Sequence, residues 1–444
     1  MSEPVLPPEL AELSALLLGP RTRHRSVTLW STEWRGEVPG RAHGLGRCGT
    51  PVHHLFAGES YARWYEAAEG QMPRVVHARR HEPGDLALPH ACAEIDVAVV
   101  WSLLFGLPFG GLVAGLLLEY EDRRSPAQAR AIPALFEDVD RRRDELAFGS
   151  SEPVKLIDVC RDGHREATDG LRLGGDMHHV TCLAPAVVGD TLAPDAHRLQ
   201  RLVSRRDAPS RSGFLTARLP AEANRYPDAV AALTPGATVL GGQEAVLELA
   251  IVLSAVQALA ALAALRQIQR RAFAALGELR APGSESSQRS WLEARSEELR
   301  DLEVDLSFGV EAYLDMRILV PSLPVEQFHS ELVDALAIER GARVSGAMLT
   351  RLAAAIDAEE TALGLVERDR ADRWRAAAGT LGAVAIALSL LLSFMGINAT
   401  EVDGRRSLFD AGHYWPYWLA LALLVAGTAG VGWTYARRRQ LAPD

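Results

Sequence analysis

The sequence predicts a cytosolic α/β domain followed by an α-helical stalk and two C-terminal transmembrane helices. Two charge-free apolar runs, 376–394 and about 416–433, each approach the roughly 20 residues that a helix needs to cross a bilayer core. From about residue 243 onward the pattern is helical almost without interruption. Residues 1–240 instead show short apolar runs punctuated by Gly, Pro and Asp, which indicates a mixed α/β domain.

The first 120 residues contain one long apolar stretch. Residues 1 to about 90 are rich in Pro, Gly, His and Trp, so we expect short strands and loops there. The first ten residues, MSEPVLPPEL, have no basic or apolar segment, so we expect no cleavable signal peptide. The stretch 95–120 has the length of a membrane span, but it is divided in the middle by Gly106, Pro108, Gly110 and Gly111. We therefore expect a buried β-turn-β or β-turn-α element.

The rest of the α/β domain is predicted from shorter patterns. Residues 121–148 indicate a charged helix. The apolar runs 154–159, 178–188 and 213–219 indicate strands. Glycines and a proline near 234–242 mark the end of the domain.

Two long helices follow. Residues 243–279 have favourable charges at both ends and a nearly all-apolar centre. This run is long enough to span a membrane, but the presence of Gln257 and the many alanines of the run favour a helix packed inside a bundle. A second helix covers about 288–319, and Pro321 and Pro324 end it.

The stalk is predicted as one helix that begins near Ala342 and continues through the first span. Over about 55 residues at 1.5 Å each, it is roughly 80–85 Å long. Apolar residues recur at nearly coiled-coil spacing, and Glu359 interrupts them: Met348, Leu352, Ile356, Leu363 and Val366. The predicted cytosolic part comprises an α/β domain (1–240), long antiparallel helices (241–325) and the stalk (326–375). The predicted membrane part comprises the first transmembrane helix (376–398), an external loop (399–415) and the second transmembrane helix (416–436), and a basic tail (437–444) follows.

Aromatic and basic residues orient the hairpin. Aromatic residues lie at both ends of the second run, as at the two interfaces of a bilayer: Trp415, Tyr417, Trp418, Trp433 and Tyr435. Arginines flank the outer ends: Arg368, Arg370, Arg373, Arg375 and Arg437 to Arg439. We therefore expect a multi-pass protein of the inner (plasma) membrane with both termini in the cytoplasm. The alternative is a helical hairpin buried in a soluble core.

Composition excludes several classes of protein. A net charge of −10 argues against a nucleic-acid binder. The four cysteines are not spaced as a disulfide framework. We find no motif for catalysis and predict neither an enzyme nor an organic cofactor. One cluster of soft ligands offers a weak regulatory metal site, against ordinary strand and loop residues: Cys160, His164, His178, His179 and Cys182.

The end of the first run carries a short motif, Gly396-Ile397-Asn398. At this position, between a stalk and a second span, the motif resembles the Gly-x-Asn signature of the CorA superfamily of divalent-cation transporters. The family's usual Tyr-Gly-Met-Asn-Phe is replaced here by Met395 to Ala399, and the Gly-Ile-Asn form resembles the ZntB branch. The architecture matches over about 243–444, whereas residues 1–240 show no specific match.

The resemblance implies a funnel-shaped homopentamer whose first transmembrane helix lines the pore. A small, polar stripe on that helix is then the pore-lining face: Gly382, Ile386, Ser389 and Ser393. The alternative is that these residues only permit close helix packing. A ring of Asn398 amides suits a hydrated divalent cation such as Mg²⁺ or Zn²⁺, because neutral oxygens can hold it through its water shell. The alternative is a simple helix cap.

Acidic residues supply two further candidate sites. Glu401, Asp403 and Asp410 would raise the cation concentration at the external mouth, or are simply solvated. Asp357, Glu359 and Glu360 on the stalk would bind regulatory cations between subunits, or form a solvated helix face.

Three functions fit these observations. The first is a divalent-cation channel or transporter gated by its cytosolic domain. The second is a CorA-like membrane effector of a bacterial defence system, gated by a nucleotide or other small molecule bound to residues 1–240. The third is a non-conducting membrane scaffold.

Overall fold

The computed structural model describes the following residues: 6–34, 48–56, 58–86, 95–121, 126–149, 154–161, 169–184, 199, 202–203, 217–278, 285–314, 320–397, 410 and 412–440. The chain forms two compact units. The first comprises Met1–Ser284 and Glu293–Ala353, and the second comprises Glu285–Leu292 and Ala354–Asp444.

An eight-stranded sheet forms the centre of the first unit. Its strand order is β2-β3-β4-β5-β1-β8-β10-β9, and every neighbouring pair is antiparallel except the parallel pair β8–β10. The strands are β1 (His24–Trp34), β2 (Thr50–Pro51), β3 (Arg74–His81), β4 (Val97–Gly106), β5 (Leu112–Tyr120), β8 (Leu171–Cys182), β9 (Val230–Thr234) and β10 (Ala237–Gly241). A separate two-stranded sheet pairs β6 (Ala147–Phe148) with β7 (Val154–Lys155). The α/β domain predicted from the sequence is confirmed.

The apolar stretch 95–120 is a buried β-hairpin, as the sequence predicts. β4 and β5 pair from Val97↔Tyr120 to Gly106↔Leu112, and almost all of their residues are buried. Between them, the Gly110 amide donates to the Leu107 carbonyl at 2.8 Å, and Gly110 has a φ of 92°. A positive φ is readily adopted only by glycine, so this residue allows the tight reversal.

Helices cover both faces of the sheet. On β8, His179 contacts Phe136 of α4 (Pro126–Arg141), with ring centroids 4.7 Å apart. Asp176 instead forms an ion pair with Arg266 of α9 (Ala245–Glu278) at 2.6 Å. Successive strand residues point to opposite faces, so residues 176 and 179 place α9 and α4 on opposite sides. α9 also packs against α1 (Pro8–Leu18) and α11 (Leu323–Ala335).

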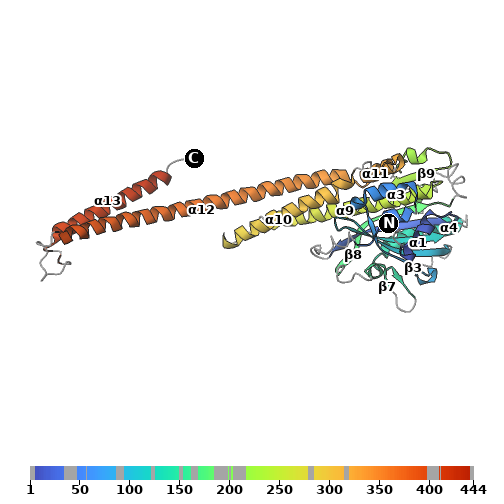
Figure 1. Cartoon of the computed structure of the whole chain (residues 1–444), viewed down its shortest axis with the longest axis horizontal. Helices are drawn as coiled ribbons and strands as arrows, with labels where there is room; N and C mark the ends of the chain where they lie inside the picture. The colour runs from blue at the N-terminus through green and yellow to red at the C-terminus, as the bar shows by residue number, and fades with distance from the viewer. Residues whose placement is uncertain are drawn as a thin grey trace, which may run out of the picture. The chain divides into compact units, whose positions relative to one another are not determined.

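The helix α9 is buried in protein, as the sequence favours, but it packs on the sheet as well as against α1 and α11 and not in an all-helical bundle. Among the described residues it is the one helix that is long and apolar enough to cross a membrane, and 78% of its most apolar window is buried inside the protein. A shorter apolar helical stretch occupies Trp415–Gly427. In Figure 1, α10 (Glu285–Gly309) runs back along α9, and Arg295 on α10 reaches Glu278 on α9 at 2.5 Å.

The helix α12 spans Ile338–Ile397, 60 residues, and includes all of the first apolar run up to Ile397. The second run lies in α13 (Trp415–Gln440), which turns back from the segment after α12 (Figure 1).

Two helix boundaries and the structure of two segments differ from the sequence expectation. The stalk helix does not begin at residue 326, because residues 323–335 form the separate helix α11. Ala337, with a φ of 54°, interrupts the helical conformation between α11 and α12. The second long helix ends at Gly309, where a 3-10 turn (Glu311–Tyr313) follows. The run 154–159 is mostly the short helix α5 (Leu156–Cys160). The N-terminal region contributes a long central strand, β1, besides α3 (Ser60–Ala67) and the 3-10 turns Val52–Phe56, Glu69–Gln71 and Pro83–Asp85.

Candidate functional site

The pore-lining stripe expected from the sequence lies on α12. Gly382, Ile386, Ser389 and Ser393 follow one another at helical spacing, and all four are exposed in the single chain. Ile386 in the stripe is 64% accessible, and the neighbouring apolar residues Leu381 and Leu390 are 71% and 66% accessible. A soluble protein rarely exposes this much contiguous apolar surface. This part of α12 therefore needs a lipid or protein neighbour.

The Gly-Ile-Asn motif coincides with the end of α12. Gly396 and Ile397 are in its last turn, and Asn398 lies just outside the described residues. The loop acids Glu401 and Asp403 are also outside them. Asp410 is described, and its carboxylate accepts the Gly412 amide at 3.2 Å in the turn that precedes α13. This contact gives Asp410 a local structural role.

The stalk acids Asp357, Glu359 and Glu360 lie on α12 and do not form a metal site in the single chain. Asp357 and Glu360 are exposed, and Glu359 is half-buried. Nowhere in the described part of the chain do three His, Cys, Asp or Glu side chains come close enough to hold a metal ion. A cation bound here would need ligands from a second copy.

The soft-ligand cluster predicted from the sequence is not brought together. Cys160 lies on α5 and donates its thiol to the Leu103 carbonyl at 3.5 Å. His178 and His179 are adjacent on β8 and therefore point to opposite faces of the sheet. His178 bonds to Thr238 at 2.8 Å, and His179 bonds to Thr28 at 2.7 Å. His164 is outside the described residues.

Burial also makes the described thiols of this cluster unsuitable as ligands. Cys160 and Cys182 are fully buried in the sheet domain. Burial raises the pKa of the Cys160 thiol to about 12, and it raises that of Cys182 as well. Because metals bind the thiolate, neither sulfur is prepared for a metal at neutral pH.

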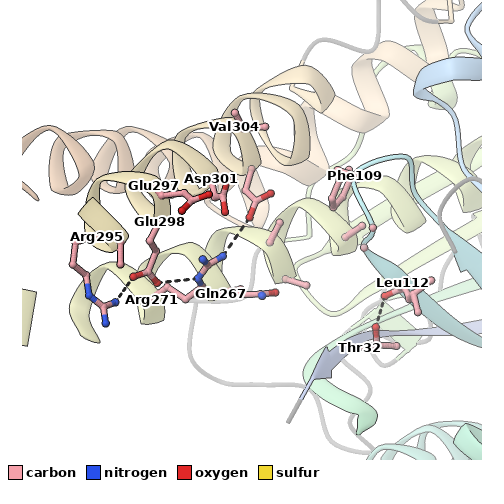
Figure 2. A pocket seen from close by; sticks show the side chains of 17 residues that line it. Thr32, Phe109, Leu112, Gln267, Arg271, Arg295, Glu297, Glu298, Asp301 and Val304 are labelled. Atoms are coloured by element: carbon pink, nitrogen blue, oxygen red, sulfur yellow. Dashed lines mark hydrogen bonds and ion pairs between the residues drawn. The ribbon is translucent and has the colours of Figure 1, made fainter. Parts of the chain in front are cut away.

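A pocket that the sequence analysis did not identify opens between α9, α10 and the β4–β5 turn (Figure 2). Its volume is about 640 Å³, within the range of small-molecule sites. The pocket exists because small residues of α9 and of the turn line it: Ala260, Ala263, Ala264, Gly110 and Gly111. Phe109 lies at one end of the pocket.

Charged side chains of α9 and α10 form the other wall of this pocket. Arg271 lies 3.3 Å from Glu298 and 3.7 Å from Asp305. Arg295 also lines the pocket, together with two exposed acids, Glu297 and Asp301. Four carboxylates therefore face two guanidinium groups, which leaves a net charge of −2 (2 − 4). This balance disfavours an anionic ligand.

The pocket was not predictable from the sequence because its lining comes from four distant segments, on β1, the β4–β5 turn, α9 and α10. The nearest signal is the spacing of Glu297 and Asp301, four residues apart on one helix face. That pattern is common on solvated helices, so it identifies no site by itself.

Comparison of the chain with models of known families, with curated proteins and with solved structures found no match.

Proposed function

We propose that this protein is a membrane-embedded channel or transporter for divalent cations, in which the C-terminal helices α12 and α13 cross the bilayer and copies of α12 line the pore. The observation that carries the proposal is the continuity of α12. One helix of 60 residues runs from Ile338 to Ile397 and ends within the Gly-Ile-Asn motif. A pore built from such helices presents its outer ends to the transported ion.

Exposed apolar side chains support the membrane assignment. On α13, Trp415 is 61%, Leu419 53% and Leu423 65% accessible, in addition to the exposed residues of α12. In water each such side chain costs on the order of 1.5–3 kcal/mol relative to burial. A bilayer removes this cost, and the internal hydrogen bonds of a helix satisfy the backbone there.

The expected assembly is a homopentamer with Asn398 in a ring at the outer mouth. An amide oxygen carries a dipole but no charge, so it binds the water shell of Mg²⁺ or Zn²⁺ without a competing salt bridge. The small side chains of Gly382, Ser389 and Ser393 keep the pore wide enough for a hydrated ion. We expect the membrane potential or an ion gradient to supply the driving force.

The test is a flux assay with the full chain in liposomes. We expect uptake of at least one of Mg²⁺, Zn²⁺, Co²⁺ and Ni²⁺, and a loss of about tenfold or more in Asn398→Ala, because one ring contact is removed from every subunit. The matched control is Gln440→Ala, which removes an amide at the end of α13. An absence of flux with every ion, under any gradient, would leave only a membrane scaffold.

A nucleotide-gated effector is the competing proposal. A nucleotide is an anion and needs basic or backbone N–H groups around its phosphates. The pocket between α9 and α10 has the opposite charge balance, and all its charged residues lie outside residues 1–240, so a nucleotide gate would need another site on that domain. A calorimetric titration of the full chain with cyclic dinucleotides distinguishes the two proposals, since the channel proposal expects no heat of binding.

A further inference from the structure

A groove lies on α12 immediately before its charge-free run. Its volume is about 490 Å³, and its described lining follows one helix face at intervals of three or four residues: Val366, Asp369, Arg370, Arg373, Trp374 and Ala377. We propose that this groove binds the headgroup phosphate of an anionic phospholipid in the inner leaflet. The inference rests on the membrane insertion proposed above.

The position of the groove agrees with the depth of lipid headgroups. Arg373 and Arg370 precede Ala376, the start of the charge-free run, by three and six residues, or about 4.5 and 9 Å of helix. The polar layer of each leaflet is about 5–8 Å thick. If the run from Ala376 fills the hydrocarbon core, Arg373 lies within the layer that contains the phosphates and Arg370 lies at its outer edge.

The guanidinium groups of the groove have the chemistry that a phosphate requires. Arginine presents a planar fork of N–H donors that matches phosphate oxygens. Arg373 is paired with Asp369 at 2.5 Å, but these side chains are 80% and 63% exposed, so the pair contributes little stability. A lipid phosphate can therefore replace Asp369 as the partner of Arg373.

The apolar part of the groove favours a lipid over a free anion. Trp374 is 72% exposed and Val366 is 53% exposed. An exposed Trp beside arginines at the end of a span is typical of residues that lie among headgroups. Inorganic phosphate would use the arginines but would leave these apolar side chains in water.

Charge selects among lipids. Each basic residue near an anionic surface adds about fivefold to membrane affinity. Arg368 and Arg375 flank the groove on α12, and three more arginines, Arg437 to Arg439, are in α13. Phosphatidylglycerol should therefore bind more tightly than zwitterionic phosphatidylcholine.

The test uses the full chain purified in detergent and titrated with phosphatidylglycerol or phosphatidylcholine, with bound lipid counted by native mass spectrometry. We expect a preference for phosphatidylglycerol of about tenfold or more, and Arg370→Gln/Arg373→Gln should reduce that preference severalfold, because the other arginines near the membrane remain. The matched control is Arg340→Gln/Arg343→Gln. Arg340 and Arg343 lie on the same helix as Arg370 and Arg373, with the same spacing, and are also exposed. Arg343 likewise forms an ion pair with an acid four residues earlier, Glu339, at 3.9 Å.

Two further measurements separate the outcomes. Flotation with vesicles followed by alkaline extraction reports insertion, and failure to insert overturns both the channel proposal and this inference. Insertion with equal binding of both lipids overturns this inference alone, and favours burial of the groove against a second copy of the chain. Displacement of phosphatidylglycerol by millimolar inorganic phosphate also overturns it, because the site would then be a simple anion site.

Discussion

Arg25 and Glu119 form an ion pair inside the sheet domain, at 2.8 Å, where β1 and β5 place them directly opposite each other. Both side chains are less than 10% exposed. The guanidinium also donates to the carbonyls of Leu16 and Leu17, the last residues of α1, at 2.5 and 2.9 Å. One side chain thus joins two strands and the end of a helix.

We expect Arg25→Gln to destabilise the sheet domain by about 3–5 kcal/mol, because it leaves the Glu119 carboxylate buried without its partner. The control is Arg23→Gln, whose partner Glu121 lies at 3.3 Å with both side chains well exposed. That change should cost less than about 1 kcal/mol. Thermal unfolding of the full chain in detergent, followed by tryptophan fluorescence, measures both. Equal midpoints for the two variants would contradict the role given to Arg25.

Asp176 gives the domain a pH dependence of unusual sign. Burial raises the pKa of its carboxyl, and the ion pair with Arg266 only partly opposes this. The folded state therefore binds the proton more tightly than the unfolded chain, whose Asp pKa is about 4. The contribution of this group to stability is greatest below about pH 4 and is lost as the pH rises through the raised folded value.

Asp176→Asn should remove this loss, so that the unfolding midpoint falls less between about pH 4 and pH 7 than in the wild type. The exposed Asp228 supplies the control, Asp228→Asn. If the unfolding midpoints of Asp176→Asn and the wild type change equally with pH, then the ion pair with Arg266 outweighs the effect of burial on the pKa of Asp176.

Gly242 and Gly58 both have a positive φ, 66° and 86°, but only Gly242 is crowded. A Cβ on Gly242 would lie 1.9 Å from the Asp228 carbonyl oxygen, whereas one on Gly58 would meet nothing within 4 Å. We expect Gly58→Ala to cost about 1–2 kcal/mol, the strain of the left-handed conformation alone. Gly242→Ala should cost clearly more, since backbone must move. Denaturant titration of both variants separates strain from collision, and equal costs would refute this distinction.

The thiols provide a check on the packing. Because Cys160 and Cys182 are buried and burial raises their pKa values, we expect neither to react with a maleimide at pH 7 while the domain is folded. Cys48 is exposed and should react. Peptide mapping of the labelled chain, before and after unfolding in guanidinium, measures this. Labelling of Cys160 in the folded chain would indicate that α5 opens.

The pore stripe leads to a test by steric block. If copies of α12 line a pore with Ser389, then Ser389→Leu should reduce ion flux by about tenfold or more, because five larger apolar side chains then narrow and dry the conduit. Val384→Leu, on the opposite face of the helix, should leave flux near the wild-type level. The liposome assay described above compares them. Equal flux in both variants would place the stripe away from the ion path.

Long periodic elements were the most predictable from the sequence. The hairpin at 95–120 follows from the glycines and proline between two apolar halves. The helix α9 follows from its length, and Gln257 indicated that it is buried in protein. In each case a local pattern and the tertiary environment favour the same structure.

The central strand β1 was not predictable, because its polar residues are buried through partners far along the chain. Thr28 pairs with His179, and Ser26 lies 3.0 Å from Tyr120. Sequence reasoning assigns such residues to loops, since burial of a polar group is tolerated only with a hydrogen bond that the sequence does not display. Adjacent residues of a strand point to opposite faces of the sheet, so His178 and His179 on β8 are separated and the expected soft-ligand cluster does not form. The assignments of Gly396 and Asn398 to an ion path stay predictions.

The burial of α9 has a consequence for how this protein is synthesised. Every strand of the described sheet precedes α9 in the chain, so the sheet on which this helix packs has left the ribosome before the helix emerges, whereas α11 is made later. Its apolar centre would otherwise be a suitable substrate for the insertion machinery. We therefore expect folding of the sheet during synthesis to shield α9 from the translocon, because domains fold as units while the chain emerges.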